Sequence, residues 1–210
     1  MKKDTPHIAI VFPDYFPESF DEFIVDGIEN ELLDLRIERK EPTAWAASEW
    51  IIPGLVAVYI LKPYFEAFLK EAGKDHYLLL KNKLNSILSK TKNINVNTIT
   101  ATETTKKIDN SNTQSKAISI FIQTKNGIVI KLLYDNTLDL ETWQKSTIDF
   151  LQLIEGHYEN TKSNLLTEYL NKLDVNRHRT IYALIDPNSK SWILINNLGQ
   201  YEIEKKMNKN

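Results

Sequence analysis

Four side chains with acid–base or ion-binding chemistry follow apolar segments in the first third of the chain. They are Asp14, Glu41, Lys62 and Tyr64. Carboxylate oxygens suit divalent cations, and an ammonium group can face a phosphate. If the apolar segments are parallel strands, their carboxyl ends meet at one sheet edge, where α/β proteins bind ligands. We therefore take these four as catalytic candidates. The alternative is that they are ordinary polar loop residues.

Alternating strand and helix patterns predict how this edge is built. Near-continuous apolar runs predict buried strands, and apolar residues at three- and four-residue steps predict helices. Ser19 and Glu22 match a capping box, and Pro63 suits a first helical position. The alternation predicts an N-terminal parallel sheet flanked by helices, in the order β-α-β-α-β-α. The predicted strands are 7–12, 35–38 and 54–61, and the predicted helices are 19–33, 44–51 and 63–88.

The C-terminal half has a different pattern. Asn126–Gly127 predicts a tight turn between two apolar strands, and Asp186–Asn188 predicts a second hairpin. A helical pattern capped by Thr137 or Asp139 lies between the hairpins, and Gly156 is a candidate break in that helix. Hairpin, helix, hairpin is typical of an antiparallel α+β lobe. The predicted division is an α/β lobe at 1–90, a polar and partly mobile connection at 91–116, the α+β lobe at 117–204 and a disordered tail at 205–210.

Composition narrows the classes of ligand. The sequence has no cysteine and six glycines. This excludes disulfides and thiolate metal sites and disfavours a glycine-built phosphate loop. No two histidines have the spacing of metal ligands on a helix, so we predict neither a metal nor a cofactor. Residues 1–75 hold 15 acidic and 8 basic side chains, whereas residues 76–116 hold 2 acidic and 7 basic side chains. The basic stretch lacks interleaved aromatics, which disfavours nucleic-acid binding.

These observations favour a binding or interaction module over an enzyme. The apolar runs are too short for a secretory leader or a membrane span, so we expect a soluble cytoplasmic protein. Abundant Lys, Asn and Ile are typical of a bacterial source. Trp45 and Trp50 stand in a short segment and are the predicted contact for a protein partner or for self-association. A hydrolase or nucleotide-processing enzyme that uses Asp14, Glu41, Lys62 and Tyr64 remains the alternative, so whether the protein is an enzyme stays open.

Overall fold

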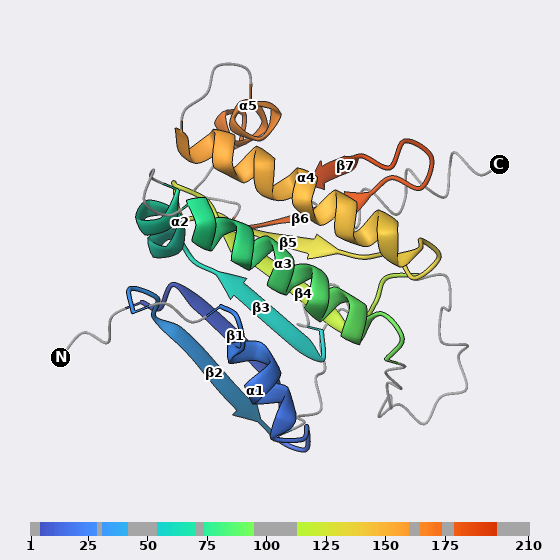
Figure 1. Ribbon diagram of the computed structural model, residues 1–210. Coiled ribbons are helices and arrows are strands. Elements are labelled where there is room, and N and C mark those ends of the chain that lie inside the picture. The colour runs from blue at the N-terminus through green and yellow to red at the C-terminus, as the bar shows by residue number, and fades with distance from the viewer. Residues whose placement is uncertain are drawn as a thin grey trace.

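The computed structural model describes seven stretches of the chain, and within them the strands form one mixed sheet (Figure 1). The described residues are 5–28, 31–41, 54–69, 74–94, 113–159, 164–173 and 179–196. The sheet has seven strands in the order β2-β1-β3-β4-β5-β6-β7. In chain order the elements are β1 (Ile8–Pro13), α1 (Ser19–Val25), β2 (Leu35–Lys40), β3 (Val56–Ile60), α2 (Lys62–Phe68), α3 (Lys74–Thr91), β4 (Ile118–Gln123), β5 (Val129–Leu133), α4 (Leu140–Glu159), α5 (Leu165–Asn171), β6 (Thr180–Ile185) and β7 (Trp192–Ile195).

Three β-α-β units make up most of this sheet. The pairs β1–β2, β3–β4 and β5–β6 are each parallel, and each pair has one or two helices between its strands in the chain. Neighbouring units meet in antiparallel pairs, β1 with β3 and β4 with β5. Strand β7 adds antiparallel to β6 through the predicted second hairpin. The general prediction of an α/β protein is therefore confirmed, but the predicted antiparallel C-terminal lobe is wrong for β5 and β6, which are parallel. Strands from both predicted lobes lie in the same sheet.

The prediction that all three N-terminal strands run parallel is wrong for β3. β1 and β2 are parallel, with Pro13 beside Lys40, but β3 runs antiparallel to β1, with Ala57 beside Val11. The chain thus leaves β2 and enters β3 at the same sheet edge. A strand that starts at the edge where its predecessor ended must run back across the sheet. The sequence pattern marked each strand without indicating this reversal.

The second and third units cross over with opposite hands. Helices α3 and α4 pack against each other on one face of the sheet (Figure 1). In the strand order, β4 lies on the same side of β3 as β6 does of β5. The strands β3 and β4 run in one direction, however, and β5 and β6 run in the opposite direction. With both crossover helices on one face, the two crossovers therefore have opposite hands. Figure 1 shows the β3–β4 crossover as right-handed, the usual hand, and the β5–β6 crossover as left-handed.

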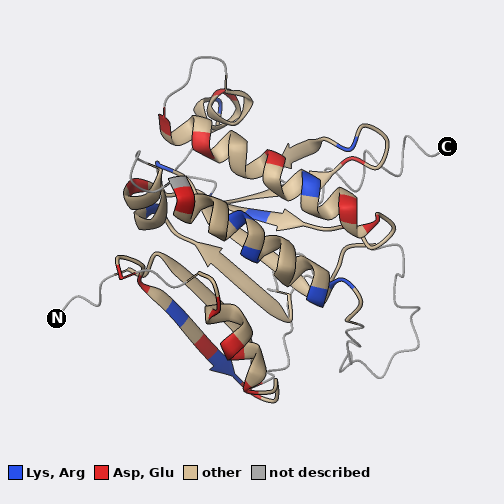
Figure 2. Ribbon diagram, in the orientation of Figure 1, with Lys and Arg blue, Asp and Glu red and all other residues tan. Residues whose placement is uncertain are grey.

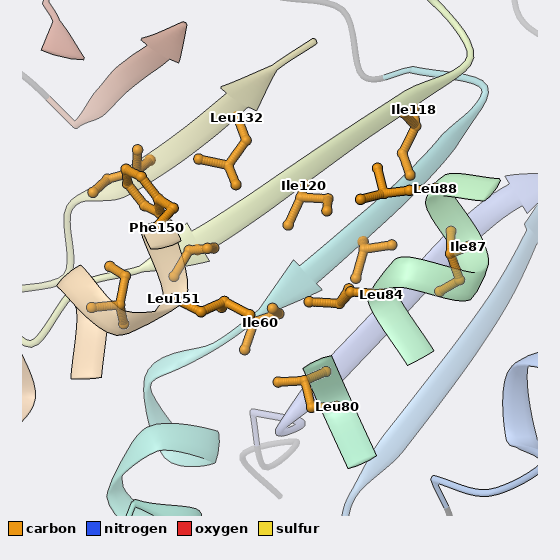
Figure 3. Close-up of a cluster of buried hydrophobic side chains, with 14 of the residues drawn as sticks. Ile60, Leu80, Leu84, Ile87, Leu88, Ile118, Ile120, Leu132, Phe150 and Leu151 are labelled. Atoms are coloured by element: carbon orange, nitrogen blue, oxygen red, sulfur yellow. The ribbon is translucent and has the colours of Figure 1, made fainter. Parts of the chain in front are cut away.

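The core lies between the sheet and the helices. Alternate residues of the central strands, including Ile60, Ile120 and Leu132, point to the helices and are fully buried against Leu84 of α3 and Phe150 of α4 (Figure 3). We call this side the helix-covered face. The other strand residues form the second face, over which no helix of the described stretches lies.

Helix ends partly follow the predictions. Pro63 stands in the first turn of α2, as predicted, and Asp139 caps α4 by accepting the Thr142 N–H at 2.6 Å. The capping box at Ser19 is wrong, because Glu18 precedes the first helical residue and no side chain caps α1. The predicted helix 63–88 is two helices, α2 and α3, whereas α4 continues through Gly156.

Candidate functional site

The structure separates the four predicted catalytic candidates into two pairs. Asp14 and Glu41 directly follow the parallel strands β1 and β2 and lie at one sheet edge. Lys62 and Tyr64 follow β3, and the Leu61 N–H donates to the carbonyl of His7 at 3.0 Å, beside the start of β1. The expectation of one shared edge is therefore wrong, because β3 runs antiparallel to β1. The catalytic role of each residue stays a prediction, and Trp45 and Trp50 lie outside the described residues.

Tyr64 and Lys62 have clear structural partners. Tyr64 is fully buried, burial raises the pKa of its hydroxyl, and the hydroxyl lies 3.3 Å from Nδ1 of His76. The other nitrogen of His76, Nε2, lies 3.0 Å from the carbonyl of Ile28. A carbonyl only accepts, so Nε2 carries the hydrogen and Nδ1 accepts from Tyr64. Lys62 forms an exposed ion pair with Glu66 at 3.4 Å. The contacts of Tyr64 and His76 connect α2, α3 and the turn that follows α1.

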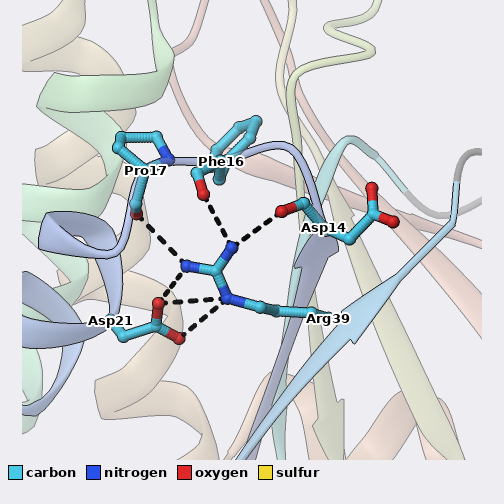
Figure 4. Close-up of polar contacts among 5 residues, drawn as sticks. All are labelled: Asp14, Phe16, Pro17, Asp21 and Arg39. Carbon is cyan, nitrogen blue, oxygen red and sulfur yellow. Dashed lines mark hydrogen bonds and ion pairs between the residues drawn. The ribbon is translucent and has the colours of Figure 1, made fainter.

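At the opposite edge, Arg39 holds the loop between β1 and α1 (Figure 4). Nη1 donates to the carbonyls of Asp14 and Phe16 at 2.8 and 2.6 Å, and Nη2 donates to the carbonyl of Pro17 at 3.2 Å. Nε and Nη2 both donate to the carboxylate of Asp21, with Nε at 3.1 Å from Oδ2. All five guanidinium N–H donors have acceptors, which only arginine's planar fork allows.

Arg39 was missed as a sequence candidate, although the sequence carries a signal for it. Leu35, Ile37 and Arg39 alternate along β2, and alternating strand residues share one face. Both apolar members pack against the core, so the arginine had to enter the apolar side and needed acceptors there. Its guanidinium carbon lies 5.3 Å from the ring centre of Phe12. The hydrogen bond to Asp21 raises the pKa of the guanidinium further, so Arg39 stays charged.

With its carbonyls turned to Arg39, the loop directs polar and aromatic side chains to solvent. Tyr15 is 63% exposed, and Asp14 and Glu18 are also exposed. Figure 4 shows the Asp14 carboxylate pointing away from the guanidinium. Phe16 anchors the loop from inside, with its ring centre 5.0 Å from that of Phe20. The loop is thus held from within while it displays a tyrosine beside two carboxylates.

The charges around the loop are mostly acidic. α1 carries Asp21 and Glu22 in its first turn, and Figure 2 shows red acidic positions along α1 and blue basic positions on α3. On the same edge strand, Lys40 lies 3.6 Å from Glu38 in an exposed ion pair. Asp21 is engaged by Arg39, so Asp14 and Glu18 are the loop carboxylates that remain for an incoming cationic group. This surface fits a basic partner better than an acidic one.

A second group of chemically notable residues crosses the second face of the sheet. Strand register places Tyr59, Phe121, Lys131 and Tyr182 side by side on β3, β4, β5 and β6. The rings of Tyr59 and Phe121 stack with centres 4.6 Å apart, and the Lys131 ammonium lies 5.5 Å from the Phe121 ring. Burial lowers the pKa of Lys131 to about 8. Lys131 is only 2% exposed, so a substrate cannot reach its ammonium in this structure.

His157 carries the other perturbed ionisable group. Its Nδ1 lies 2.9 Å from the hydroxyl of Thr167, which joins the end of α4 to α5. Its Nε2 is buried and has no hydrogen-bond partner in the part of the chain that the structure describes. Burial, and then the nearby charge of Lys125, lower the pKa of the imidazole. Within the described residues no carboxylate hydrogen-bonds this imidazole, so the His157–Thr167 pair lacks the orienting acid of a hydrolytic triad.

In the described stretches, no three His, Asp or Glu side chains gather to hold a metal ion. None of the helices in these stretches has the length and apolarity of a membrane span. The fold and the loop together define a mixed α/β protein that displays a fixed acidic and aromatic loop. The sequence matches no protein-family model, and neither a similar curated protein nor a similar solved structure was found.

Proposed function

We propose that the protein is an interaction module whose β1–α1 loop binds a protein partner with a basic surface. The observation that carries this proposal is the guanidinium of Arg39, which donates to three carbonyls of the loop and to the carboxylate of Asp21 on α1. A loop that is already ordered before binding loses little conformational entropy when a partner docks. Exposed Tyr15 is the side chain most suited to anchor that partner, since tyrosine is enriched among binding hot spots.

Charge supports the choice of a basic partner. Asp14 and Glu18 flank Tyr15 and are exposed. Complementary rim charges speed association and are screened by salt. Binding should therefore weaken as salt is raised from about 0.05 to 0.5 M, where the screening length falls from more than 10 Å to a few ångströms.

The experiment begins with affinity capture from the native host and continues with purified components. A captured protein is identified, purified separately and titrated calorimetrically against the wild type, Tyr15→Ala and the pair Asp14→Asn/Glu18→Gln. Leu165→Ala is the matched control, because Leu165 is also a largely exposed apolar side chain, at 70%, but lies on α5. Tyr15→Ala should weaken binding at least tenfold, which corresponds to about 1.4 kcal/mol. Equal affinity for the wild type and Tyr15→Ala would refute the loop as the binding site.

Trp45 and Trp50 remain a proposed second contact. They follow Glu41 in the chain, and Glu41 lies at the same sheet edge as Asp14. A Trp45→Ala/Trp50→Ala variant belongs in the same titration. If it loses affinity while Tyr15→Ala does not, the partner binds through the tryptophans and not through the loop.

The enzyme alternative rests on a smaller group of residues than the sequence suggested. Asp14 and Glu41 follow neighbouring parallel strands, which is the usual position for ligand-binding carboxylates in α/β proteins. A thermal-shift screen with divalent cations and nucleotides, each at millimolar concentration, tests this alternative. A stabilised wild type with an unresponsive Asp14→Ala variant would favour a hydrolase or nucleotide-processing enzyme over the interaction module.

The setting proposed for this function is the bacterial cytoplasm. The absence of cysteine and the abundance of Lys, Asn and Ile support it. Fractionation of the native host followed by immunoblotting would test the compartment. Recovery in a secreted fraction would count against the proposal.

A further inference from the structure

The two outer strands of the sheet, β2 and β7, differ in how they are protected from pairing with another strand. The β2 edge has the sequence L-R-I-E-R-K, with four charged side chains, whereas the β7 edge is W-I-L-I with none. Charges on edge strands discourage strand addition, and apolar edges invite it. Only one of the two outer edges therefore lacks this charge-based protection.

The hairpin fixes which backbone groups of β7 face outward. The Asp186 N–H donates to the carbonyl of Ser191 at 2.8 Å, so this opposed pair is a hydrogen-bonded one. Hydrogen-bonded and non-hydrogen-bonded pairs alternate along an antiparallel ladder. Ile193 and Ile195 therefore direct their backbone groups to β6, and Trp192 and Leu194 direct theirs away from it. Within the described stretches, nothing pairs with these outward groups.

We propose that β7 pairs antiparallel with β7 of a second copy of this chain, about a two-fold axis at Ile193. In this register Trp192 lies opposite Leu194 of the second copy, and the reverse pair forms on the other side of the axis. Each of these pairs exchanges two backbone hydrogen bonds, so all outward groups of Trp192 and Leu194 are satisfied. The proposal does not depend on the β1–α1 loop, which lies on the other half of the sheet.

Side-chain packing agrees with this register. Trp192 and Leu194 both point to the helix-covered face, where Trp192 donates through Nε1 to the Ser146 carbonyl at 2.6 Å. The two Ile193 side chains, one from each copy, lie opposite each other on the second face. They form a non-hydrogen-bonded pair, the kind in which opposed side chains come closest. The residues about the axis, Trp192 to Leu194, are all apolar and meet only each other in the second copy, while Ile195 lies opposite Ser191, so no charge faces the strand. This self-complementarity is what a two-fold interface requires.

Sedimentation velocity of the full chain tests the proposal. A single four-residue strand makes a small interface, so a concentration-dependent dimer should form, with dissociation in the micromolar range or weaker. Ile193→Lys sets two like charges across the axis and should give a monomer at every concentration. Val11→Lys is the matched control, because Val11 is also a half-buried aliphatic residue on the second face, but on β1. It should dimerise like the wild type.

Cross-linking tests the register directly, because the chain has no cysteine of its own. Under mild oxidation Ile193→Cys should form a disulfide-linked dimer, since Cα atoms in such a pair lie about 4.5 Å apart. Ile195→Cys is on the same face, two residues from the axis, and should not cross-link. A wild type that stays monomeric at all concentrations would overturn the proposal. So would a dimer that Ile193→Lys leaves intact, or cross-linking at Ile195→Cys but not at Ile193→Cys.

Discussion

Arg39 on β2 and Asp21 on α1 face each other across the first β-α-β unit, 18 residues apart in the chain, and their ion pair holds the loop that precedes α1. The carboxylate takes one side of the guanidinium, and the loop carbonyls take the other. The sheet, the helix and the loop between them are thus connected by one side chain. The loop is thereby held on its inner side, while Tyr15 stays exposed.

Replacing Arg39 by lysine should loosen the loop without unfolding the sheet. Lysine keeps the charge but has three donors at one point, so it cannot reach the loop carbonyls and Asp21 together. Amide hydrogen exchange of residues 14–18 should accelerate in Arg39→Lys, while exchange in β4 and β5 stays unchanged. Arg36→Lys, the same substitution on the opposite face of β2, is the control. Equal loop protection in both variants would show that Arg39 does not order the loop.

Gly54 should tolerate no side chain. A Cβ at Gly54 would lie 2.5 Å from the carbonyl carbon of Ile118. The backbone N–H of Gly54 also donates to the Ser119 hydroxyl at 2.8 Å, which fixes this close approach. Backbone cannot move aside cheaply, so Gly54→Ala should lower the free energy of unfolding by about 2–3 kcal/mol in urea titrations. Gly127→Ala meets no atom within 4 Å but has φ +83°, so it should cost about 1 kcal/mol through strain alone. A Gly54→Ala variant as stable as Gly127→Ala would contradict the close approach.

Lys131 should make the protein more stable at alkaline pH. Burial lowers the pKa of Lys131 to about 8 from an ordinary 10.5. The unfolded chain therefore holds this proton more tightly, and the free energy of unfolding should rise as pH increases from about 8 towards 10. Below pH 8 the lysine is charged in both states, and Lys131→Met should stabilise the fold by about 2–3 kcal/mol. Lys145→Met, at an exposed position on α4, is the control, and a Lys131→Met variant with the wild-type pH slope would be inconsistent with this assignment.

His157 should make the protein less stable in mild acid. Its folded pKa lies below the ordinary 6.5, so the unfolded chain binds this proton more readily. The contribution is fully present above pH 6.5 and is lost as pH falls from 6.5 towards the folded pKa. Urea titrations between pH 5 and 8 should show a steeper loss in the wild type than in His157→Gln. Parallel profiles for the two proteins would rule out His157 as the source of the acid sensitivity.

The sequence alone determined where the described strands lie and where several turns and helix starts fall, because those signals are local, whereas the breaks within long helical patterns were not determined. Apolar runs or apolar alternation marked the strands of the described stretches, Pro63 marked the start of α2, and Asn126–Gly127 marked the β4–β5 hairpin, where Gly127 adopts φ +83°. Each signal arises from the backbone and side-chain preferences of a few adjacent residues.

Only the tertiary structure decided the direction of β3 and therefore whether the four predicted site residues lie together. Whether a strand runs parallel or antiparallel depends on which edge the preceding connection returns to, and no local pattern in residues 41–55 carries that information. The reversal placed Lys62 and Tyr64 away from Asp14 and Glu41. The same holds for Arg39, whose position on the apolar face was visible in the alternation of β2 but whose acceptors come from a loop and a helix earlier in the chain. These groups come together through contacts between segments that are far apart in the chain, and local sequence patterns do not show which distant segments will pair.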